Sequence, residues 1–227
     1  MTDPNVTEIV AILDRSGSMG TLIAETIGGF NNFVEEQKKT DGKAILTLVQ
    51  FDDQYQIDYE GVDVNDVKPL DEKTYVPRGM TALLDAVGKT IVSVGERLSH
   101  TEEEKRPGQV VFLIITDGME NSSQEYKADK VKEMVKHQTD KYNWSFVFMG
   151  GGDIDSQKDQ IDQGMALGIN AANAYAYSAN TIGTANLYAN VSKGVSRMRR
   201  AASAGRAFSS SDSLLTDEEK NNLITPK

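Results

Sequence analysis

The most constraining feature of this sequence is a series of short, almost unbroken apolar runs that alternate with segments of helical periodicity. The runs 8–13, 44–51, 110–116 and 144–149 lack the polar alternation of a strand that has one face in water. Between them, apolar residues recur at spacings of three and four. This alternation predicts an α/β, doubly wound domain, in which helices cover both faces of a mostly parallel sheet.

The remaining segments complete the same series. We expect further strands at 55–59 and 173–177 and helices at 23–34, 83–98, 155–163 and 181–200. A capping-box match, Ser122-x-x-Glu125, predicts the start of another helix before Ala128. The pattern assigns residues 5–200 to one domain. Beyond it, the serine-rich stretch 209–213 predicts a flexible tail over 201–227, in which Thr216-x-x-Glu219 suits a short capped helix.

Composition and charge exclude several classes of protein. The chain has no cysteine, so disulfides, thiol catalysis and thiolate metal sites are absent. Its net charge of −10 argues against a general nucleic-acid binder. The longest apolar run has six residues, which is too short for a membrane span, and no secretory signal is visible at the start. We therefore expect a cytoplasmic protein that binds neither nucleic acid nor membrane.

One stretch departs from the acidic balance. Residues 187–206 carry five basic side chains and no acidic one. This stretch has two interpretations, a docking patch for an acidic partner or the solvated face of a late helix. We favour the solvated face, because runs of charge usually point to water.

The residues with the most chemical promise follow the buried runs. In a doubly wound sheet, ligands bind outside the carboxyl ends of the strands. The first run is followed by Asp14, Ser16 and Ser18, and the third long run by Asp117. Thr81 lies at the beginning of the clearest helix. Three separate loops therefore bring two carboxylates and three hydroxyls to one edge of the sheet.

Five oxygen donors without nitrogen or sulfur suit a hard cation, which means Mg²⁺ first, with Mn²⁺ or Ca²⁺ as alternatives. Two carboxylates balance a divalent charge without surplus, so the cation can accept one more anionic oxygen from a partner's Asp or Glu. Each residue alone has a simpler interpretation: a helix cap for Asp14 or Thr81, and a turn former for Asp117. The combination on one sheet edge favours the metal site.

The same residues carry a resemblance to a known family. Three motifs resemble the metal-ion-dependent adhesion site of von Willebrand factor type A domains over roughly residues 5 to 200: Asp14-x-Ser16-x-Ser18, Gly79-x-Thr81 and Thr116-Asp117-Gly118. The resemblance implies that Ser16, Ser18 and Thr81 contact the metal directly, that Asp14 and Asp117 act largely through bound water, and that a partner's carboxylate completes the site. It also implies an intracellular adaptor or assembly module of the bacterial or phage type, whose partner is an AAA+ ATPase or an assembly component.

We therefore predict a metal-dependent protein-binding module and no enzyme. The alternative is a Mg²⁺-dependent phosphoryl-transfer or hydrolytic enzyme, in which Arg15 or Arg78 would face a phosphate. The serines have no neighbouring base, and Arg15 is expected to point to solvent. A third interpretation, a structural subunit with an unused site, also remains open.

Overall fold

A computed structural model describes residues 2–206 and 208–224 of the chain. Its centre is a sheet of six strands in the order β3-β2-β1-β4-β5-β6. All neighbouring strands are parallel except the β2–β3 pair, which is antiparallel. The strands are β1 (Asp3–Asp14), β2 (Lys43–Phe51), β3 (Tyr55–Asp63), β4 (Pro107–Thr116), β5 (Ser145–Gly152) and β6 (Ala174–Ser178). The predicted doubly wound α/β fold is thus confirmed, with each strand close to its expected position.

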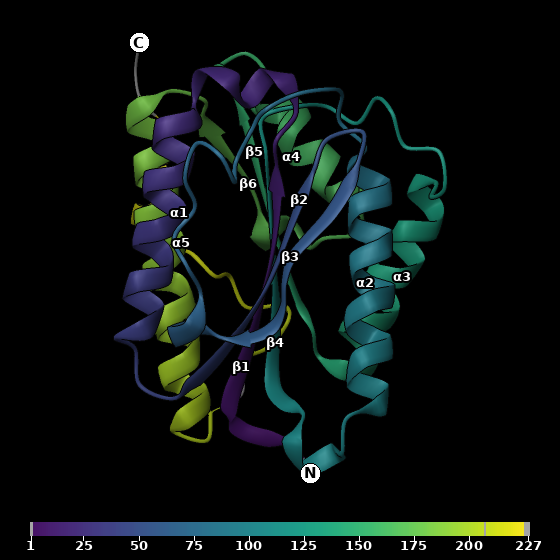
Figure 1. Ribbon diagram of the computed structural model, residues 1–227, viewed down its shortest axis with the longest axis vertical. Coiled ribbons are helices and arrows are strands. Elements are labelled where there is room, and N and C mark those ends of the chain that lie inside the picture. The colour runs from purple at the N-terminus through teal and green to yellow at the C-terminus, as the bar shows by residue number, and fades with distance from the viewer. Residues whose placement is uncertain (1, 207, 225–227) are drawn as a thin grey trace.

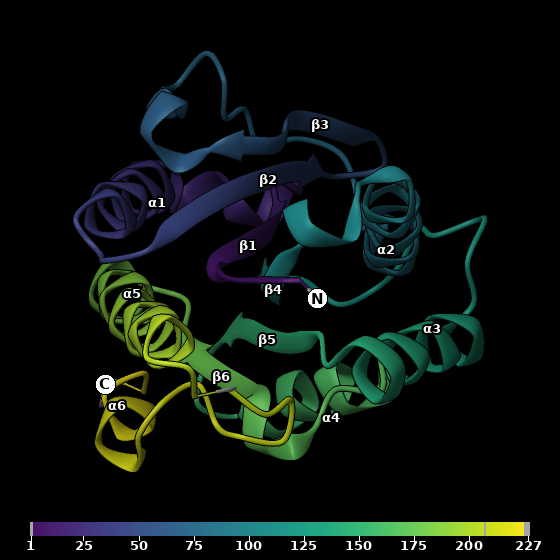
Figure 2. The same cartoon turned by 90° about the horizontal axis from the view of Figure 1, so that it is seen from below.

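Helices cover both faces of this sheet (Figures 1 and 2). The helices are α1 (Ile23–Lys38), α2 (Leu83–His100), α3 (Ala128–Tyr142), α4 (Gln157–Ala166), α5 (Thr181–Ser203) and α6 (Asp217–Asn221), with short 3₁₀ turns at Gly17–Thr21, Val64–Asp66, Glu103–Lys105 and Ala171–Asn173. In the described part of the chain, no helix combines the length and apolar character needed to span a membrane.

The core is divided into two layers by the sheet. Alternate residues of β1 show why: Ile9, Ala11 and Leu13 pack with α1 and α5, whereas Val10 and Ile12 pack with α2 and α3. All five side chains are almost completely buried. A strand buried on both faces has no polar positions to alternate, which is the physical reason for the unbroken apolar runs.

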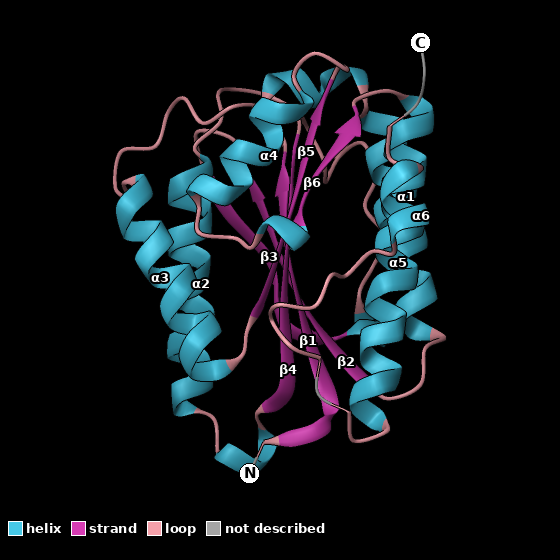
Figure 3. Cartoon of the chain, turned by 180° about the vertical axis from the view of Figure 1, so that it is seen from behind, coloured by secondary structure: helices cyan, strands magenta, loops and turns pink. Residues whose placement is uncertain are grey.

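The chain order places a topological switch point between β1 and β4. From β1 the chain proceeds to β2 on one side, and it later returns to form β4 on the other side. Adjacent helices cannot both fill the space above such a point, so a crevice opens at the carboxyl ends of the two strands. The connecting loops gather at this end, which is the top of the molecule in Figures 1 and 3.

Two predicted helix starts have different outcomes. The expected capping box of Ser122 and Glu125 is wrong, because α3 begins only at Ala128 and has Lys127 as its N-cap. Residues 122–125 instead belong to an ordered loop, in which the backbone N–H of Ser122 donates to the Glu120 carboxylate. The capping box of Thr216 and Glu219 is present at the start of α6.

The expectation of a flexible tail needs correction. Helix α5 continues to Ser203, and the following segment folds back against α5 and β6, where α6 lies at the edge of the molecule (Figure 2). Leu214, Leu215 and Leu223 each expose only 1–2% of their surface in the core layer of α1 and α5. Burial of these three side chains offsets the entropy cost of ordering the serine-rich stretch. Residues 207 and 225–227 of the expected tail lie outside the described residues.

The basic stretch on α5 is only partly a solvated face. Arg199 is 2% exposed, and its guanidinium donates to the backbone carbonyls of Gln37 in the last turn of α1 and of Thr40 and Gly42 just after this helix. A cation suits this position because the last carbonyls of a helix lack intrahelical partners. The interpretation as a wholly solvated charge run is therefore wrong for Arg199.

Candidate metal centre

The candidate centre is built on the carboxyl end of β1. Asp14 is the last residue of this strand and is fully buried. Its Oδ1 accepts from the backbone N–H of Ser16 at 2.6 Å, and its Oδ2 accepts from Thr116 Oγ1 at 2.5 Å. The β1–β4 register explains the second contact, since Leu13 pairs with Ile115 and the next residues are Asp14 and Thr116.

Two serines connect this carboxylate to the loop after β4. Ser16 Oγ and Ser18 Oγ lie 3.1 Å apart, and Ser18 Oγ donates to Asp117 Oδ1 at 2.5 Å. The Asp-x-Ser-x-Ser spacing thus places both hydroxyls at the start of a 3₁₀ turn, with Ser16 as its N-cap and Ser18 as its second residue. The structure brings Asp14, Ser16, Ser18 and Asp117 into one connected group of oxygen atoms.

Thr81 reaches the same place from the loop before α2. A Cβ added to Gly118 would lie 2.8 Å from Thr81 Oγ1, so the hydroxyl sits directly against the backbone after Asp117. The backbone N–H of Thr81 donates to Asn121 Oδ1, and its carbonyl accepts from the N–H of Asn121. Thr81 precedes α2 rather than lying in its first turn, and Ala82 occupies the N-cap. The helix-cap interpretation of Thr81 therefore fails.

The hydrogen-bond partners of the two carboxylates of the centre, Asp14 and Asp117, are a backbone amide and hydroxyls, with no cationic side chain among these described contacts. Burial raises the pKa of Asp14 to about 6, although hydrogen bonds from Thr116 and Ser16 oppose this change. Burial also raises the pKa of Asp117. Among the residues that the structure describes, no three His, Cys, Asp or Glu side chains gather in one cluster, so a zinc-type or all-carboxylate site has no support there.

A second buried carboxylate, which the sequence reasoning missed, stands beside the centre. Asp52 follows β2 and is fully buried; its Oδ2 accepts from Arg15 Nε at 3.1 Å and from Arg78 Nε at 2.8 Å. The Asp52 carbonyl also accepts from Ala82 N–H, and the Arg78 N–H donates to the Arg15 carbonyl. These bonds tie the loop that carries Thr81 to the loop after β1. Arg15 is 5% exposed, which corrects the expectation that it points to solvent.

Two further contacts of Asp14 were also missed. Thr116 was quoted as part of a motif, but its hydroxyl bond to the carboxylate was not anticipated. Tyr75 is fully buried, and its Oη donates to the Asp14 carbonyl at 2.7 Å. A sequence signal was available for Asp52, since it follows a buried strand just as Asp14 does. Tyr75 lies in a loop without periodicity and gave no such signal.

Comparisons with known proteins bear on the fold. No protein-family model and no curated protein match this sequence. Among solved structures, proximal thread matrix protein 1 from the mussel byssus superposes with a TM-score of 0.58 at 14% identity, over 89% of this chain and 48% of that one. A structure of the same protein with a zinc-occupied MIDAS motif superposes with a TM-score of 0.58 at 17% identity, over 84% of this chain and 46% of that one. A von Willebrand factor type A protein from Catenulispora acidiphila superposes with a TM-score of 0.50 at 12% identity, over 86% of this chain and 42% of that one.

The chain thus spans about half the length of these solved chains. At such low identity the likeness concerns the fold, and the superposed region includes nearly all of this chain. Together with the sheet order and the strand-end loops, these superpositions show that the chain has the von Willebrand factor type A fold.

Proposed function

We propose that this protein binds one divalent cation with the oxygen atoms of five residues, and that the cation then captures a carboxylate from a protein partner. The five residues are Asp14, Ser16, Ser18, Thr81 and Asp117. In this proposal the three hydroxyls contact the cation directly and the two carboxylates act largely through bound water. Mg²⁺ is the first choice, with Mn²⁺ and Ca²⁺ as alternatives, because the donors are hard oxygens.

The observation that carries the proposal is the hydrogen-bonded group formed by Ser16, Ser18 and Asp117 next to the buried Asp14 carboxylate. Burial of a carboxylate without a cationic partner is costly, and the raised pKa of Asp14 expresses that cost. A bound divalent cation would supply the missing positive charge. Because two carboxylates match two positive charges, the bound cation keeps affinity for an additional anionic oxygen.

The proposed partner is a protein, in agreement with the resemblance of the motif to an adhesion site. We expect an AAA+ ATPase or a bacterial or phage assembly component, and a cytoplasmic site of action. A binding role also agrees with the contacts of the serines: the carboxylate that accepts from Ser18 Oγ is Asp117, which this proposal assigns to the metal rather than to proton abstraction.

The hydrolytic alternative finds little support in the arginine contacts. The Nε atoms of Arg15 and Arg78 both donate to Asp52, and their terminal nitrogens donate to Gln56 and Gln54. Both guanidinium groups are thus engaged in holding loops together. Phosphoryl transfer would require at least one of them to face the transferred group.

A pair of threonine variants tests the proposal. Thr81→Ala removes one proposed ligand, and Thr101→Ala removes a comparable hydroxyl at the other end of α2, where it donates to the Arg97 carbonyl. We expect calorimetry to show weaker Mg²⁺ binding in Thr81→Ala alone. Affinity capture of partners in Mg²⁺ but not in EDTA should be lost in the same variant. Equal metal affinity in the two variants would contradict the assignment of Thr81.

A further inference from the structure

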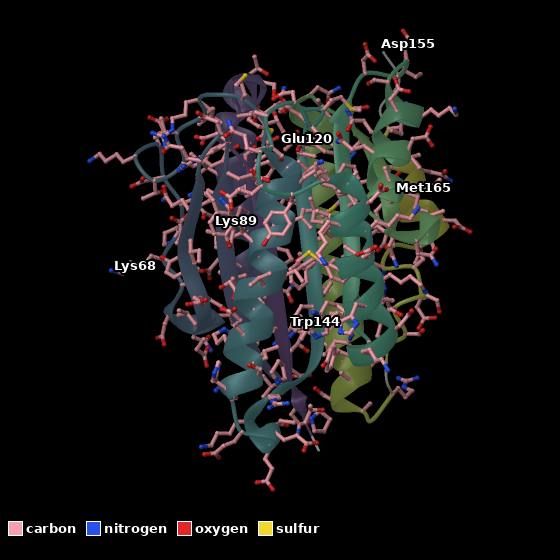
Figure 4. All side chains as sticks on the ribbon, turned by 90° about the vertical axis from the view of Figure 1, so that its right-hand side faces the viewer. Lys68, Lys89, Glu120, Trp144, Asp155 and Met165 are labelled. Atoms are coloured by element: carbon pink, nitrogen blue, oxygen red, sulfur yellow. The ribbon has the colours of Figure 1, made fainter. Side chains whose placement is uncertain are left out.

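A small apolar groove begins directly beside the candidate metal centre. It has a volume of about 360 Å³, and its exposed lining is almost entirely apolar. Leu84 of α2, Met119 after β4 and Ala166 of α4 contribute to its walls. Figure 4 shows this side of the molecule, with Glu120 near the upper edge and Met165 marking α4.

One glutamine fixes the groove to the loop of the metal centre. Gln163 of α4 donates to the carbonyl of Gly118 at 3.1 Å and accepts from the N–H of Glu120 at 2.8 Å. These two bonds hold the backbone on either side of Met119. Met119 is the second residue after Asp117, and its neighbour Gly118 lies so close to Thr81 that an added Cβ would be 2.8 Å from Thr81 Oγ1. The groove and the centre are therefore adjoining parts of one surface.

Exposed apolar side chains are concentrated at the same edge of the sheet. Nine large apolar side chains are exposed among the described residues, and more than half of them lie in the loops or first helical turn at the carboxyl ends of the strands: Val76, Met80, Met119, Ile154 and Ile182. Met80 and Met119 are 56% and 48% exposed and flank the Thr81 and Asp117 loops. Exposed apolar surface of this kind marks interaction sites, and methionine adapts to varied partners.

We propose that the groove binds a large apolar side chain of the same partner segment whose carboxylate reaches the metal. This inference rests on the proposed function and specifies its partner. The partner would present an Asp or Glu with a large apolar residue within about three positions, since an extended chain advances roughly 3.3 Å per residue.

The charges around the groove further restrict the partner. Asp159, Asp162 and Glu120 lie at the rim of the groove. Lys158 pairs with Asp162 at 3.4 Å, so the acidic side chains outnumber the basic one there. A partner segment with several adjacent acidic residues would be repelled there. The segment that fits best therefore carries a single acidic residue next to its apolar anchor, rather than an acidic cluster.

A random peptide library tests this specificity without knowledge of the natural partner. Phage-displayed peptides are selected on immobilised wild-type protein in Mg²⁺ and eluted with EDTA. We expect the eluted sequences to be enriched in one Asp or Glu with Leu, Ile, Met or Phe within three positions. Enrichment of acidic residues without apolar neighbours would overturn the groove inference and leave the metal proposal standing. No enrichment of acidic residues would contradict both.

Two methionine variants then test the groove itself. Met119→Ser alters the groove. Met165→Ser changes a methionine that does not line the groove but has a similar exposure, 40% for Met165 against 48% for Met119. We expect a selected peptide to bind about tenfold more weakly to Met119→Ser and with unchanged affinity to Met165→Ser. The Mg²⁺ affinity of both variants should equal that of the wild type. Equal peptide affinity for the two variants would overturn the inference.

A substitution on α4 provides a second test of the groove, because Met119→Ser changes the loop that also carries Asp117. Ala166→Asp places a charge in the groove from an exposed position on a separate element. It should retain Mg²⁺ binding and lose the selected peptide. Retention of both Mg²⁺ and peptide binding would contradict the inference.

Discussion

Two fully buried carboxylates stand at the ends of neighbouring strands, and their surroundings differ. Asp52, after β2, accepts from two guanidinium groups. Asp14, at the end of β1, accepts from a backbone amide and a hydroxyl. Both aspartates organise loops at the same sheet edge, but only Asp52 has a cationic partner among these contacts.

The difference indicates two roles for the same side chain. The negative charge of Asp52 is compensated by two arginines. The role of Asp52 is therefore to hold the Thr81 loop against the loop after β1. Asp14 keeps a raised pKa because burial opposes its charge. We interpret Asp14 as one half of an ion pair whose other half is the metal.

The largest effect on stability should come from Asp52→Asn. This change leaves the buried Arg15 guanidinium without its carboxylate, and removal of one member of a buried pair costs about 3–5 kcal/mol. Arg78 adds little, because its side chain is 51% exposed. Urea denaturation would measure the loss, with the exposed neighbour Asp53→Asn as a control that should stay within about 0.5 kcal/mol of the wild type.

Asp14→Asn should behave differently from Asp52→Asn in the same experiment without metal. The introduced amide retains an acceptor for the Ser16 N–H, and Thr116 Oγ1 lies near enough to the Gly118 carbonyl to donate there instead. We therefore expect a loss below about 1 kcal/mol, since a buried charge is also removed. If Asp14→Asn destabilised the apoprotein as much as Asp52→Asn, the distinction between the two aspartates would be lost.

An effect on metal affinity, smaller than the loss of stability in Asp52→Asn, is expected for Thr116→Val. The hydroxyl of Thr116 orients the Asp14 carboxylate, and loss of such an outer partner typically lowers metal affinity about 10–100-fold. Thr47→Val is a matched control, because Thr47 donates to the buried Glu8 carboxylate far from the centre. A Mn²⁺ titration that gave equal affinities for both variants would contradict the role of Thr116.

The smallest effect concerns pH. Protonated Asp14 must lose its proton to interact with a cation, and its pKa is about 6. Metal affinity should therefore be about tenfold lower at pH 5 than at pH 7.5. For the protein without metal, the quantity that depends on pH is the folding stability, and it changes in the opposite direction. The folded state holds the Asp14 proton more tightly than the unfolded state, so stability falls as pH rises from about 4 to about 6. Metal affinity that was independent of pH between 5 and 7.5 would count against Asp14 as a charged participant.

Much of the fold was predictable because the unbroken apolar runs of the strands and the spacing of three and four in the helices were both strong signals. The run 8–13 is buried on both faces, and the stripe from Leu83 to Leu98 gave α2 its position. The C-terminal segment was not predictable in the same way. Its anchors, Leu214, Leu215 and Leu223, are too few and too widely spaced to show a period, and their burial depends on the distant α5 and β6. Gly194 permits this approach, since a Cβ there would lie 2.7 Å from the Leu214 carbonyl oxygen.

The candidate site was predictable to the level of its loops. Parallel strands bring their carboxyl ends to one edge, so the proximity of Asp14, Ser16, Ser18 and Asp117 followed from topology. Thr81 lies in the loop between the antiparallel strand β3 and α2, and its place was expected from its position before the helix and from the motif. Contacts between unrelated segments did not follow. Arg15 carries the same charge whether it is solvated or buried, and only the position of Asp52 across the loop decides between the two.

A calorimetric titration of the wild-type protein and Asp14→Asn with Mg²⁺ and Mn²⁺ at pH 7.5 tests the proposed metal centre most directly. We expect one bound ion per wild-type chain and no measurable binding to Asp14→Asn, while circular dichroism shows both chains folded. Equal binding by the two proteins, or none by the wild type, would contradict the assignment of this sheet edge as a metal centre.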